Sequence, residues 1–352
     1  MLVRVIGAGV AGLTAAFEIA RMGAPHGAQV ELVEKNPQPG RGCSFFAGGM
    51  IAPWCELQSA EPLVAELGRE ALSFWTRDVP VAEVAGSLVV APARDHAELE
   101  DFTRRTRRFE RLDEAGVAAL EPDLAGRFSQ ALFFPEEAHL EPRAAMQALF
   151  QCLGRLENVA IRLGADAAEE ASRPDWTIDC RGYAARGDLD GLRGVKGEML
   201  VLRSEEIELS RPVRMLHPRH PVYIVPRGAG VFMVGATMIE NEERSRVTAR
   251  SIVELVNSAY AIHPAFAEAE ILETGSDVRP AFADNLPRIV ARGRTLYING
   301  LYRHGFLLAP ALARRAARFL LAGEYFPEVM NADHGERTDA RGRGADARAP
   351  AR

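Results

Sequence analysis

Three glycines and one acidic residue near the start of the chain have the types and spacing of a dinucleotide site. Gly7, Gly9 and Gly12 form a G-x-G-x-x-G motif, and Glu34 follows about 20 residues later. The first glycine permits a tight turn, the second lets a diphosphate approach the backbone, and the third lets a helix pack closely. An acid at this distance accepts hydrogen bonds from ribose hydroxyls. The pattern therefore favours NAD or FAD over NADP.

The elements around this motif are the ones that it requires. Residues 2–6 are an apolar run rich in β-branched side chains, which predicts a buried strand. Residues 13–22 predict a helix, and residues 30–33 predict a second strand that ends at the acid. The free N–H groups at the start of such a helix face the phosphates, where the helix dipole favours negative charge. Strand, glycine turn, helix, strand and acid in this order predict a bound dinucleotide.

Further along the chain, the hydrophobic periodicity and turn residues predict alternating helices and strands. We expect helices at residues 60–77, 95–108, 113–120, 142–156, 248–262 and 310–322. We expect strands at residues 86–91, 131–134, 176–180, 197–203, 222–227, 231–235, 270–278 and 294–298. The strand at 176–180 should return to the first sheet, and the pair at 222–235 should form a hairpin. Ser59 is expected to cap the helix at 60–77.

Several loops offer further contacts for an extended cofactor. Residues 47–53 are mostly small, so that backbone amides could touch a flat ring or a diphosphate, although a flexible loop would have the same composition. Arg181-Gly182 follows the returning strand and forms a second point of backbone approach. Besides the motif, the expected cofactor-binding residues in the first half of the fold are Val10, Ala11, Lys35, Arg41, Gly42, Cys43, Ser44, Ala47, Gly48, Gly49, Met50, Cys180, Arg181 and Gly182.

Composition excludes several classes of protein. A chain of 352 residues suits two domains, and its formal net charge of -6 argues against nucleic-acid binding. No run of 18 apolar residues occurs, so we expect no membrane span and a cytoplasmic protein. The four cysteines have neither metal-ligand nor disulfide spacing, which predicts four reduced thiols and no metal site. The polar residues 331–352 are expected to be disordered.

Motifs in the second half of the chain resemble a known family. The chain resembles the FAD-dependent amino-acid oxidases of the D-amino-acid-oxidase type, in particular the glycine oxidases of the thiamine pathway. Besides the glycine motif, the resemblance rests on residues 47–50 (AGGM), 195–200 (VKGEML), 223–227 (YIVPR), 234–238 (VGATM), 278–280 (VRP) and 299–310 (NGLYRHGFLLAP). The chain departs from the family pattern at the bulky loop 41–46, at His304 and at Asp277, which puts the exact substrate in doubt more than the cofactor.

The resemblance implies a fold and a division into domains. The fold would be of the α/β class, with a Rossmann-like FAD-binding domain and an antiparallel-sheet α+β substrate domain. Residues 1–81, 141–194 and 276–330 would form the FAD domain, and residues 82–140 and 195–275 the substrate domain. The chain would cross between the two several times, and the family suggests a tetramer or a dimer.

The resemblance also implies roles for four side chains in catalysis. Arg279 would hold the substrate carboxylate, for which a planar guanidinium is suited, and Tyr223 would donate a hydrogen bond to the same group. Arg303 would lie by the substrate and the flavin, and Met238 would line the substrate pocket. From sequence alone, Arg279 could instead form a structural ion pair, Tyr223 could be a core residue and Met238 a gap filler. We expect no general base on the protein.

At the cofactor, the resemblance implies non-covalent FAD with its reacting end near residues 303–307. Arg303, His304, Gly305, Phe306 and Leu307 would surround the flavin at the start of the last helix, which would stabilise reduced flavin. Glycine, sarcosine or a D-amino acid would pass a hydride to flavin N5, and O2 would then give H2O2, with glyoxylate and ammonia released or the imine handed to thiazole synthesis. The alternatives are a dehydrogenase that reduces a quinone and a flavin-bound scaffold without turnover; a tRNA-modifying flavoprotein is disfavoured by the acidic balance.

Overall fold

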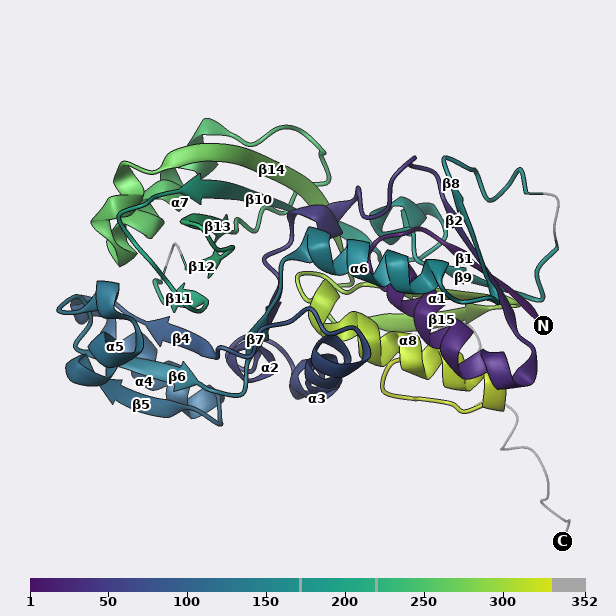
Figure 1. Cartoon of the computed structure of the whole chain (residues 1–352), viewed down its shortest axis with the longest axis horizontal. Helices are drawn as coiled ribbons and strands as arrows, with labels where there is room; N and C mark the ends of the chain where they lie inside the picture. Colours follow the sequence, from purple (N-terminus) through teal and green to yellow (C-terminus); the bar gives the residue numbers. More distant parts are fainter. Residues whose placement is uncertain (171–172, 219–220, 331–352) are drawn as a thin grey trace, which may run out of the picture.

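The strands of the protein fall into two large sheets that lie side by side (Figure 1). The computed structural model describes residues 1–170, 173–218 and 221–330. The tail at 331–352, predicted to be disordered, lies outside the described residues. One sheet has six strands and the other has eight, and a pair of two-residue strands lies apart from both. Mostly parallel strands with covering helices in one half and antiparallel strands in the other confirm the predicted α/β class.

The six-stranded sheet is built around β1 (Leu2–Ile6), which pairs in parallel with the strands on both of its sides. Its order is β15-β16-β9-β1-β2-β8, and every pair is parallel except the hairpin of β15 and β16. The other strands are β2 (Gln29–Glu34), β8 (Val159–Leu163), β9 (Trp176–Asp179), β15 (Arg288–Arg292) and β16 (Thr295–Asn299). The prediction that residues 176–180 return to the first sheet is confirmed. The edge strands β8 and β15 were not predicted, because their apolar runs are short and interrupted by arginine.

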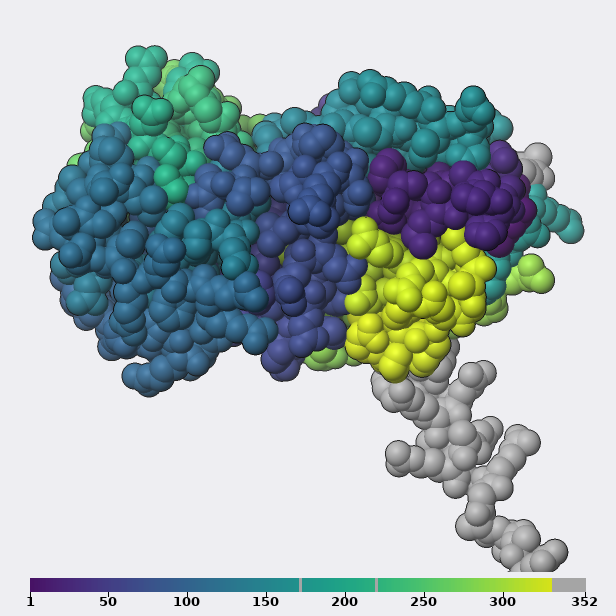
Figure 2. All heavy atoms as spheres, turned by 60° about the horizontal axis from the view of Figure 1, so that its bottom comes forward, coloured from purple at the N-terminus to yellow at the C-terminus, as the bar shows by residue number. Residues whose placement is uncertain are grey.

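Four helices pack on this sheet and on each other. They are α1 (Val10–Gly23), α3 (Pro62–Ser73), α6 (Pro142–Gly154) and α8 (Gly305–Ala322). Figure 2 shows α1, in purple, directly beside the yellow α8 at the molecular surface. Small buried residues such as Ala16, Ala20 and Ala313 let these helices approach one another closely. The resulting core fixes the N-terminal ends of α1 and α8 relative to the sheet.

The eight-stranded sheet has the order β14-β10-β13-β12-β11-β4-β6-β5. Its pairs are antiparallel except β11 with β4. The strands are β4 (Ser87–Val90), β5 (Glu110–Asp113), β6 (Gln130–Phe134), β10 (Arg193–Arg203), β11 (Val213–Met215), β12 (Val222–Pro226), β13 (Val231–Gly235) and β14 (Glu270–Ala281). The predicted hairpin is β12 and β13. The helices of this half are α4 (His96–Arg105), α5 (Glu114–Leu120) and α7 (Ala249–Ile262).

Short elements connect the two halves and complete the fold. The strands β3 (Met50–Ile51) and β7 (Ala138–His139) pair in antiparallel fashion, and the one-turn helix α2 (Pro53–Glu56) follows β3 directly. The remaining helical turns are η1 (Ala24–His26), η2 (Cys43–Phe46), η3 (Phe74–Asp78), η4 (Ala93–Asp95), η5 (Pro122–Leu124), η6 (Gly182–Gly187) and η7 (Pro264–Ala267). The predicted domain boundaries at residues 194–195 and 275–276 fall inside β10 and β14. The division into two domains therefore stays a prediction.

The last helix begins five residues earlier than predicted. We expected it to start at Pro310, but α8 begins at Gly305 and contains this proline. Proline has no N–H, so the carbonyl of Phe306, four residues earlier, lacks its helical donor. The indole N–H of Trp75 donates to this carbonyl at 2.8 Å and takes the place of the missing donor. A side chain distant in sequence thus permits the helix to continue through the proline.

Two predicted boundaries at the helix of residues 60–77 are also wrong. The α-helix ends at Ser73 and continues as the π-helical turn η3. Its N-cap residue is Glu61 rather than Ser59. The Ser59 hydroxyl instead accepts a hydrogen bond from Arg303 at 2.6 Å. This long-range partner could not be inferred from the local sequence.

Candidate active site

The glycine turn between β1 and α1 brings strand, helix and returning strand into close contact. Gly7 has a φ of 97°, and a Cβ at this position would lie 2.8 Å from the carbonyl oxygen of Cys180. A Cβ on Gly12 would lie 1.7 Å from the carbonyl oxygen of Gly7. No side chain fits in that space, so the helix approaches the strand only because Gly12 has none.

The N-terminal end of α1 presents backbone donors to the space beyond the turn. The Val10 N–H donates to the Ser44 hydroxyl at 3.2 Å, and a Cβ on Gly9 would lie 3.3 Å from the same hydroxyl oxygen. Ser44 therefore stands over the turn. The first intrahelical hydrogen bond runs from Leu13 to Gly9, which leaves the N–H groups of Ala11 and Gly12 for an anionic ligand.

Glu34 lies at the end of β2 beside the glycine turn. One carboxylate oxygen accepts the Ala8 N–H at 2.6 Å, and the other accepts the Asn36 N–H at 2.8 Å. The second oxygen also accepts the Asn36 side-chain N–H at 2.7 Å, so the oxygen bonded to Ala8 is the one whose second lone pair can still accept from a ribose hydroxyl. The Lys35 ammonium points away into solvent, 4.0 Å from the Asp166 carboxylate, so only its backbone could contact a cofactor.

The N-terminal end of α8 lies next to that of α1. A Cβ on Gly305 would lie 3.2 Å from a methyl carbon of Val10. The first intrahelical bond of α8 runs from Leu308 to His304, so the N–H groups of residues 305–307 have no helical partner. Two helix ends with positive partial charge thus converge on one place, which suits an anionic group.

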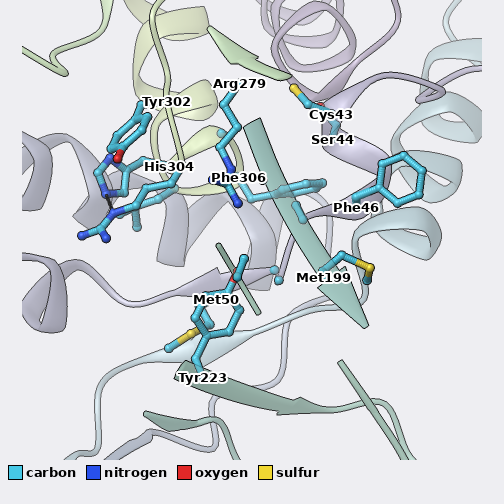
Figure 3. A pocket seen from close by; sticks show the side chains of 18 of the residues that line it. Cys43, Ser44, Phe46, Met50, Met199, Tyr223, Arg279, Tyr302, His304 and Phe306 are labelled. Atoms are coloured by element: carbon cyan, nitrogen blue, oxygen red, sulfur yellow. Dashed lines mark hydrogen bonds between the residues drawn. The ribbon is translucent and has the colours of Figure 1, made fainter. Parts of the chain in front are cut away.

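A cavity of about 1300 Å³, open to solvent, lies between these helix ends and the eight-stranded sheet (Figure 3). It brings together more than half of the predicted site residues: Val10, Cys43, Ser44, Ala47, Gly48, Gly49, Met50, Tyr223, Met238, Arg279, Arg303, His304, Gly305, Phe306 and Leu307. The predicted residues that do not line it are Gly7, Gly9, Ala11, Gly12, Glu34, Lys35, Arg41, Gly42, Cys180, Arg181 and Gly182. Most of this second group surrounds the glycine turn.

Two predicted arginines make contacts outside the cavity. Arg41 donates to the Gln38 side chain at 2.9 Å, and its guanidinium carbon lies 4.9 Å from the centre of the Phe45 ring. Arg181 donates to the carboxylates of Asp179 and Asp188, each at 2.7 Å. The Arg181–Gly182 turn is nevertheless well defined, because the Asn299 side chain donates to the Gly182 carbonyl at 2.9 Å.

The sheet wall of the cavity holds Tyr223 in a narrow slot. A Cβ on Gly48 would lie 2.6 Å from the tyrosine ring, and a Cβ on Gly235 would lie 2.7 Å from its hydroxyl oxygen. The two glycines therefore clamp the ring from two segments of the chain. Burial raises the pKa of the Tyr223 phenol. Within the described chain its hydroxyl makes no hydrogen bond, so it is available to a ligand.

Arg279 reaches into the cavity opposite Tyr223, and the two side chains extend toward each other (Figure 3). The guanidinium lies against Gly197, where a Cβ would be 2.2 Å from one of its nitrogens. It donates to the Thr237 carbonyl at 3.1 Å. No carboxylate of the described residues forms an ion pair with Arg279. The structural ion pair that the sequence left open for this residue is therefore absent from the described part of the chain.

Glu56, which was not predicted, is the acidic centre of the opposite wall. Its carboxylate accepts from Arg303 at 2.6 Å, lies 2.9 Å from the His304 ring nitrogen, and pairs with Arg214 at 3.4 Å. Burial acts to raise the pKa of Glu56, but Arg303 and its basic neighbours hold it well below its usual range. An acid directly after the apolar stretch 52–55 was the only sequence signal for this residue.

The mouth of the cavity is formed by less polar side chains. Met238 is 51% exposed, and the Tyr302 hydroxyl donates to its sulfur at 3.3 Å. Exposure of Met238 contradicts the alternative that it is a gap filler in the core. The other lining residues that sequence reasoning missed are Phe46, Ala52, Gly197, Met199, Arg214, Pro221, Val222, Ala236, Asp277 and Tyr302.

The four cysteines are free, as predicted. Cys43 lines the cavity, where burial and the nearby Asp277 raise the pKa of its thiol to about 11. A protonated thiol is a poor nucleophile, which supports the prediction of a non-covalent flavin. The described residues contain no group of three or more metal-type side chains. None of their helices is long and apolar enough to cross a bilayer.

The model of the DAO family of FAD-dependent oxidoreductases matches residues 3–319. The chain belongs to this family. FAD is therefore its cofactor, and the glycine turn with its two converging helix ends fits an extended, anionic dinucleotide. As a DAO-family member it is an oxidoreductase, and its fold is that of the solved structures described next.

Three comparisons show which proteins this DAO-family chain is similar to. It is 55% identical over 330 residues to the "Putative thiamine biosynthesis oxidoreductase ThiO" of Rhizobium etli, covering 93% of this chain and 99% of that protein. It is 24% identical to the "Bifunctional protein ThiO/ThiG" of Nostoc, covering 90% of this chain and 52% of that protein. The crystal structure of glycine oxidase from Bacillus cereus superposes with a TM-score of 0.76 at 22% identity, covering 92% of this chain and 95% of that chain.

Proposed function

We propose that this enzyme oxidises the amine of glycine, or of a small relative such as sarcosine or a D-amino acid, to the imine. The observation that carries the proposal is the Arg279 guanidinium, which lines the cavity without an acidic partner among the described residues and faces Tyr223. A half-buried arginine without a carboxylate partner is suited to a carboxylate supplied by a ligand. The names of the relatives support an amino-acid substrate.

Arg279 and Tyr223 hold the substrate carboxylate in this proposal. The guanidinium is braced against Gly197 and the Thr237 carbonyl, so its remaining donors point in a fixed direction. The Tyr223 ring is clamped by two glycines, so its hydroxyl is equally fixed. Two rigid donors on opposite sides of one carboxylate orient the substrate with little loss of entropy on binding.

The cofactor is held by the glycine turn, Ser44 and the N-terminal end of α8. Bound FAD supplies the two-electron oxidation of the substrate Cα–N bond. The N–H groups of Gly305, Phe306 and Leu307 and the Arg303 guanidinium lie at the cavity, where they would stabilise negative charge on the bound cofactor. Since Arg303 is anchored by Glu56 and Ser59, it stabilises this charge without having to move.

No protein group is needed as a general base. The substrate amine loses its proton to solvent before it reacts, and the cavity is open to solvent. The exposed Met238 and the half-buried Tyr302 at the mouth would limit the size of the substituent on the amine. In the complete reaction, glycine, O2 and water give glyoxylate, ammonia and H2O2, so that both electrons of the amine end on oxygen.

The names of the relatives support a place for the reaction in metabolism. The ThiO name of the 55% identical protein supports a role in thiamine biosynthesis. A relative with ThiO and ThiG in one chain supports a hand-off of the imine to thiazole synthesis. We also propose residues 1–81, 141–194 and 276–330 as the FAD domain, with residues 82–140 and 195–275 as the substrate domain, in a homo-oligomer.

Anaerobic mixing of the purified holoenzyme with an amine tests the proposal. Glycine, sarcosine and D-alanine are added separately, and the loss of the oxidised flavin absorbance is followed. We expect at least one of the three to bleach the flavin, and readmitted air to restore the colour within seconds with one H2O2 formed per flavin.

The other outcomes identify the competing functions. Bleaching followed by recolouring over hours, but fast recolouring with a quinone, would identify a dehydrogenase. A yellow protein that none of the amines bleaches would contradict the proposal and favour a scaffold without turnover. Ethylamine is the control, because it has the amine but lacks the carboxylate that Arg279 would bind.

A further inference from the structure

The one-turn helix α2 holds the acid that anchors the Arg303 side of the cavity. Glu56 is the last residue of α2 (Pro53–Glu56), which lies beside β7 (Figure 1). A single turn is not stable by itself, because helix nucleation is unfavourable. The position of Glu56, and with it the position of Arg303 and His304, therefore depends on what holds α2 in place.

The outer side of α2 is packed against cationic side chains. The guanidinium carbons of Arg69, Arg107 and Arg108 lie 5.7, 5.5 and 4.8 Å from the centre of the Trp54 ring. These contacts come from α3 and from the segment that follows α4. They do not satisfy the backbone donors at the start of α2, which need a separate acceptor.

That acceptor is a buried carboxylate that the proposed reaction does not use. One oxygen of Glu137 accepts the N–H of Trp54 at 2.9 Å and the N–H of Cys55 at 2.8 Å. Glu137 is 0% exposed and directly precedes β7. Its backbone is fixed as well, since its carbonyl accepts the Gly86 N–H at 2.9 Å. The side chain thus ties α2 to the strand that pairs with β3.

Glu137 has no basic partner among the described residues, and its second oxygen is buried without a hydrogen bond. The groups that face it are Cys55 and Glu56 from α2 and Ser87 from β4, and Arg214 acts on the neighbouring Cys55 thiol. Burial, together with the negative charge of Glu56, raises the pKa of Glu137 to about 7. The carboxyl therefore changes its charge in the neutral pH range, and it contacts the helix whose last residue, Glu56, lines the cavity.

We propose that Glu137 is a positioning residue that sets the place of the Glu56–Arg303–His304 cluster by capping α2. When Glu137 is ionised, its two hydrogen bonds to the α2 backbone are charge-assisted and hold the helix more firmly. When it is protonated, these bonds weaken and the ion pairs of Glu56 lose part of their support. Because Glu56, Arg303 and His304 line the same cavity as Arg279, the electrostatic environment of a carboxylate ligand there then depends on a residue that never touches the ligand.

The test compares wild type with Glu137→Gln and Glu137→Ala as holoenzymes between pH 5.5 and 9. Glutamine keeps an oxygen that can accept from both α2 amides but has no charge at any pH. The probe is acetate, whose binding perturbs the flavin absorbance without turnover. We expect wild type to bind acetate several-fold more tightly above pH 7 than below it. This comparison is made after correction for the pH dependence of acetate binding that all the variants share. Glu137→Gln should lack this step, and Glu137→Ala should bind acetate weakly throughout.

A second readout does not involve the ligand. An acid with a raised pKa in the folded state lowers stability as pH rises from its unfolded value toward the folded one. The thermal midpoint of wild type should therefore fall relative to that of Glu137→Gln between pH 5 and 7.5, and the difference should be constant above. Asp113→Asn is the matched control, because Asp113 caps α5 by accepting the Gly116 N–H at 2.8 Å, remote from the cavity.

Two results would overturn the inference: an acetate profile of Glu137→Gln identical to that of wild type, or an unchanged acetate affinity in Glu137→Ala. The inference rests on the proposed carboxylate site, and the two can fail separately. If acetate perturbs no variant's flavin at any pH, the proposed site is wrong. If acetate binds all variants equally, the site is right and the role of Glu137 is wrong. Asp113→Asn should match wild type in both readouts.

Discussion

The two ends of the site are built in different ways. At the cofactor end, a single stretch from β1 to β2 supplies the glycine turn, the helix end and Glu34. Gly12 is in close contact with Gly7 in the same stretch, and Gly7 is in close contact with Cys180, directly after the adjacent strand β9. At the reacting end, Glu56, Tyr223, Arg279 and Arg303 come from four separate segments. The first end depends on local geometry, whereas the second depends on the docking of two sheets.

This difference predicts that the two ends fail in different ways. A change in the glycine turn should remove FAD together with all activity, because the contacts of Gly7 and Gly12 leave no room for a side chain. A change among the long-range partners should leave FAD bound and alter affinity or stability by amounts that depend on one contact. The following variants test the comparison from the largest expected effect to the smallest.

Gly12→Ala should abolish FAD binding. The new Cβ would lie 1.7 Å from the Gly7 carbonyl oxygen, so α1 would have to move away from β1. Overpacking of this kind costs about 1–3 kcal/mol or more. The flavin-to-protein ratio after gel filtration measures the loss. Gly154→Ala at the end of α6, where a Cβ has no neighbour within 4 Å, should keep full flavin content. A yellow Gly12→Ala protein would contradict the packing argument.

Glu56→Gln should keep FAD but lose stability at neutral pH. It leaves Arg303 and Arg214 without their partner, and breaking a buried ion pair costs about 3–5 kcal/mol. Because its folded pKa is depressed, Glu56 contributes stability that is present above its ordinary pKa of 4.5 and is lost as pH falls below it. Thermal midpoints should therefore differ widely at pH 7 and converge toward pH 3.5.

Glu100→Gln is the control for this pH dependence, since the exposed Glu100 pairs with Arg111 at the surface and its loss should not change the midpoint. A difference between wild type and Glu56→Gln that stayed constant down to pH 3.5 would show that the ion pairs of Glu56 do not stabilise the fold.

Trp75→Phe should destabilise the protein by about 1–3 kcal/mol, the cost of an unsatisfied buried carbonyl. The variant removes the N–H that serves the Phe306 carbonyl in place of the one that Pro310 lacks. Urea unfolding of a double-mutant cycle isolates this effect. In a Pro310→Ala background the new N–H can serve the carbonyl, so Trp75→Phe should cost less there. Equal costs in both backgrounds would refute the role of the indole.

Tyr223→Phe should have the smallest effect, a loss of about tenfold in apparent glycine affinity from one hydrogen bond of about 1.5 kcal/mol to a carboxylate. The ring and its clamp by Gly48 and Gly235 are kept, so thermal stability should not fall. Steady-state kinetics at varied glycine measure the change. Tyr325→Phe, an exposed tyrosine near the end of the described chain, should match wild type in glycine affinity. An unchanged KM in Tyr223→Phe would mean that the phenol does not contact the substrate.

The same contrast explains what could be predicted from sequence. The glycine motif, Glu34 and the return of residues 176–180 were readable because turn chemistry and apolar runs encode them locally. Arg279, Tyr223 and Arg303 were found only by resemblance to a family. Glu56, Arg214 and Glu137 were missed, because their partners are brought together by sheet docking. The predicted start of α8 was wrong because the N–H that replaces the one missing at Pro310 belongs to Trp75, which is far away in the chain.

The most direct test of the central claim is the anaerobic reduction of the flavin by glycine in wild type and Arg279→Met. The claim is that Arg279 binds the substrate carboxylate. We predict that glycine bleaches wild type and that the apparent dissociation constant rises about 100-fold or more in Arg279→Met, from the loss of roughly 3 kcal/mol of charge pairing. Flavin content should be the same in both proteins. Equal glycine affinity in the two proteins would contradict the account.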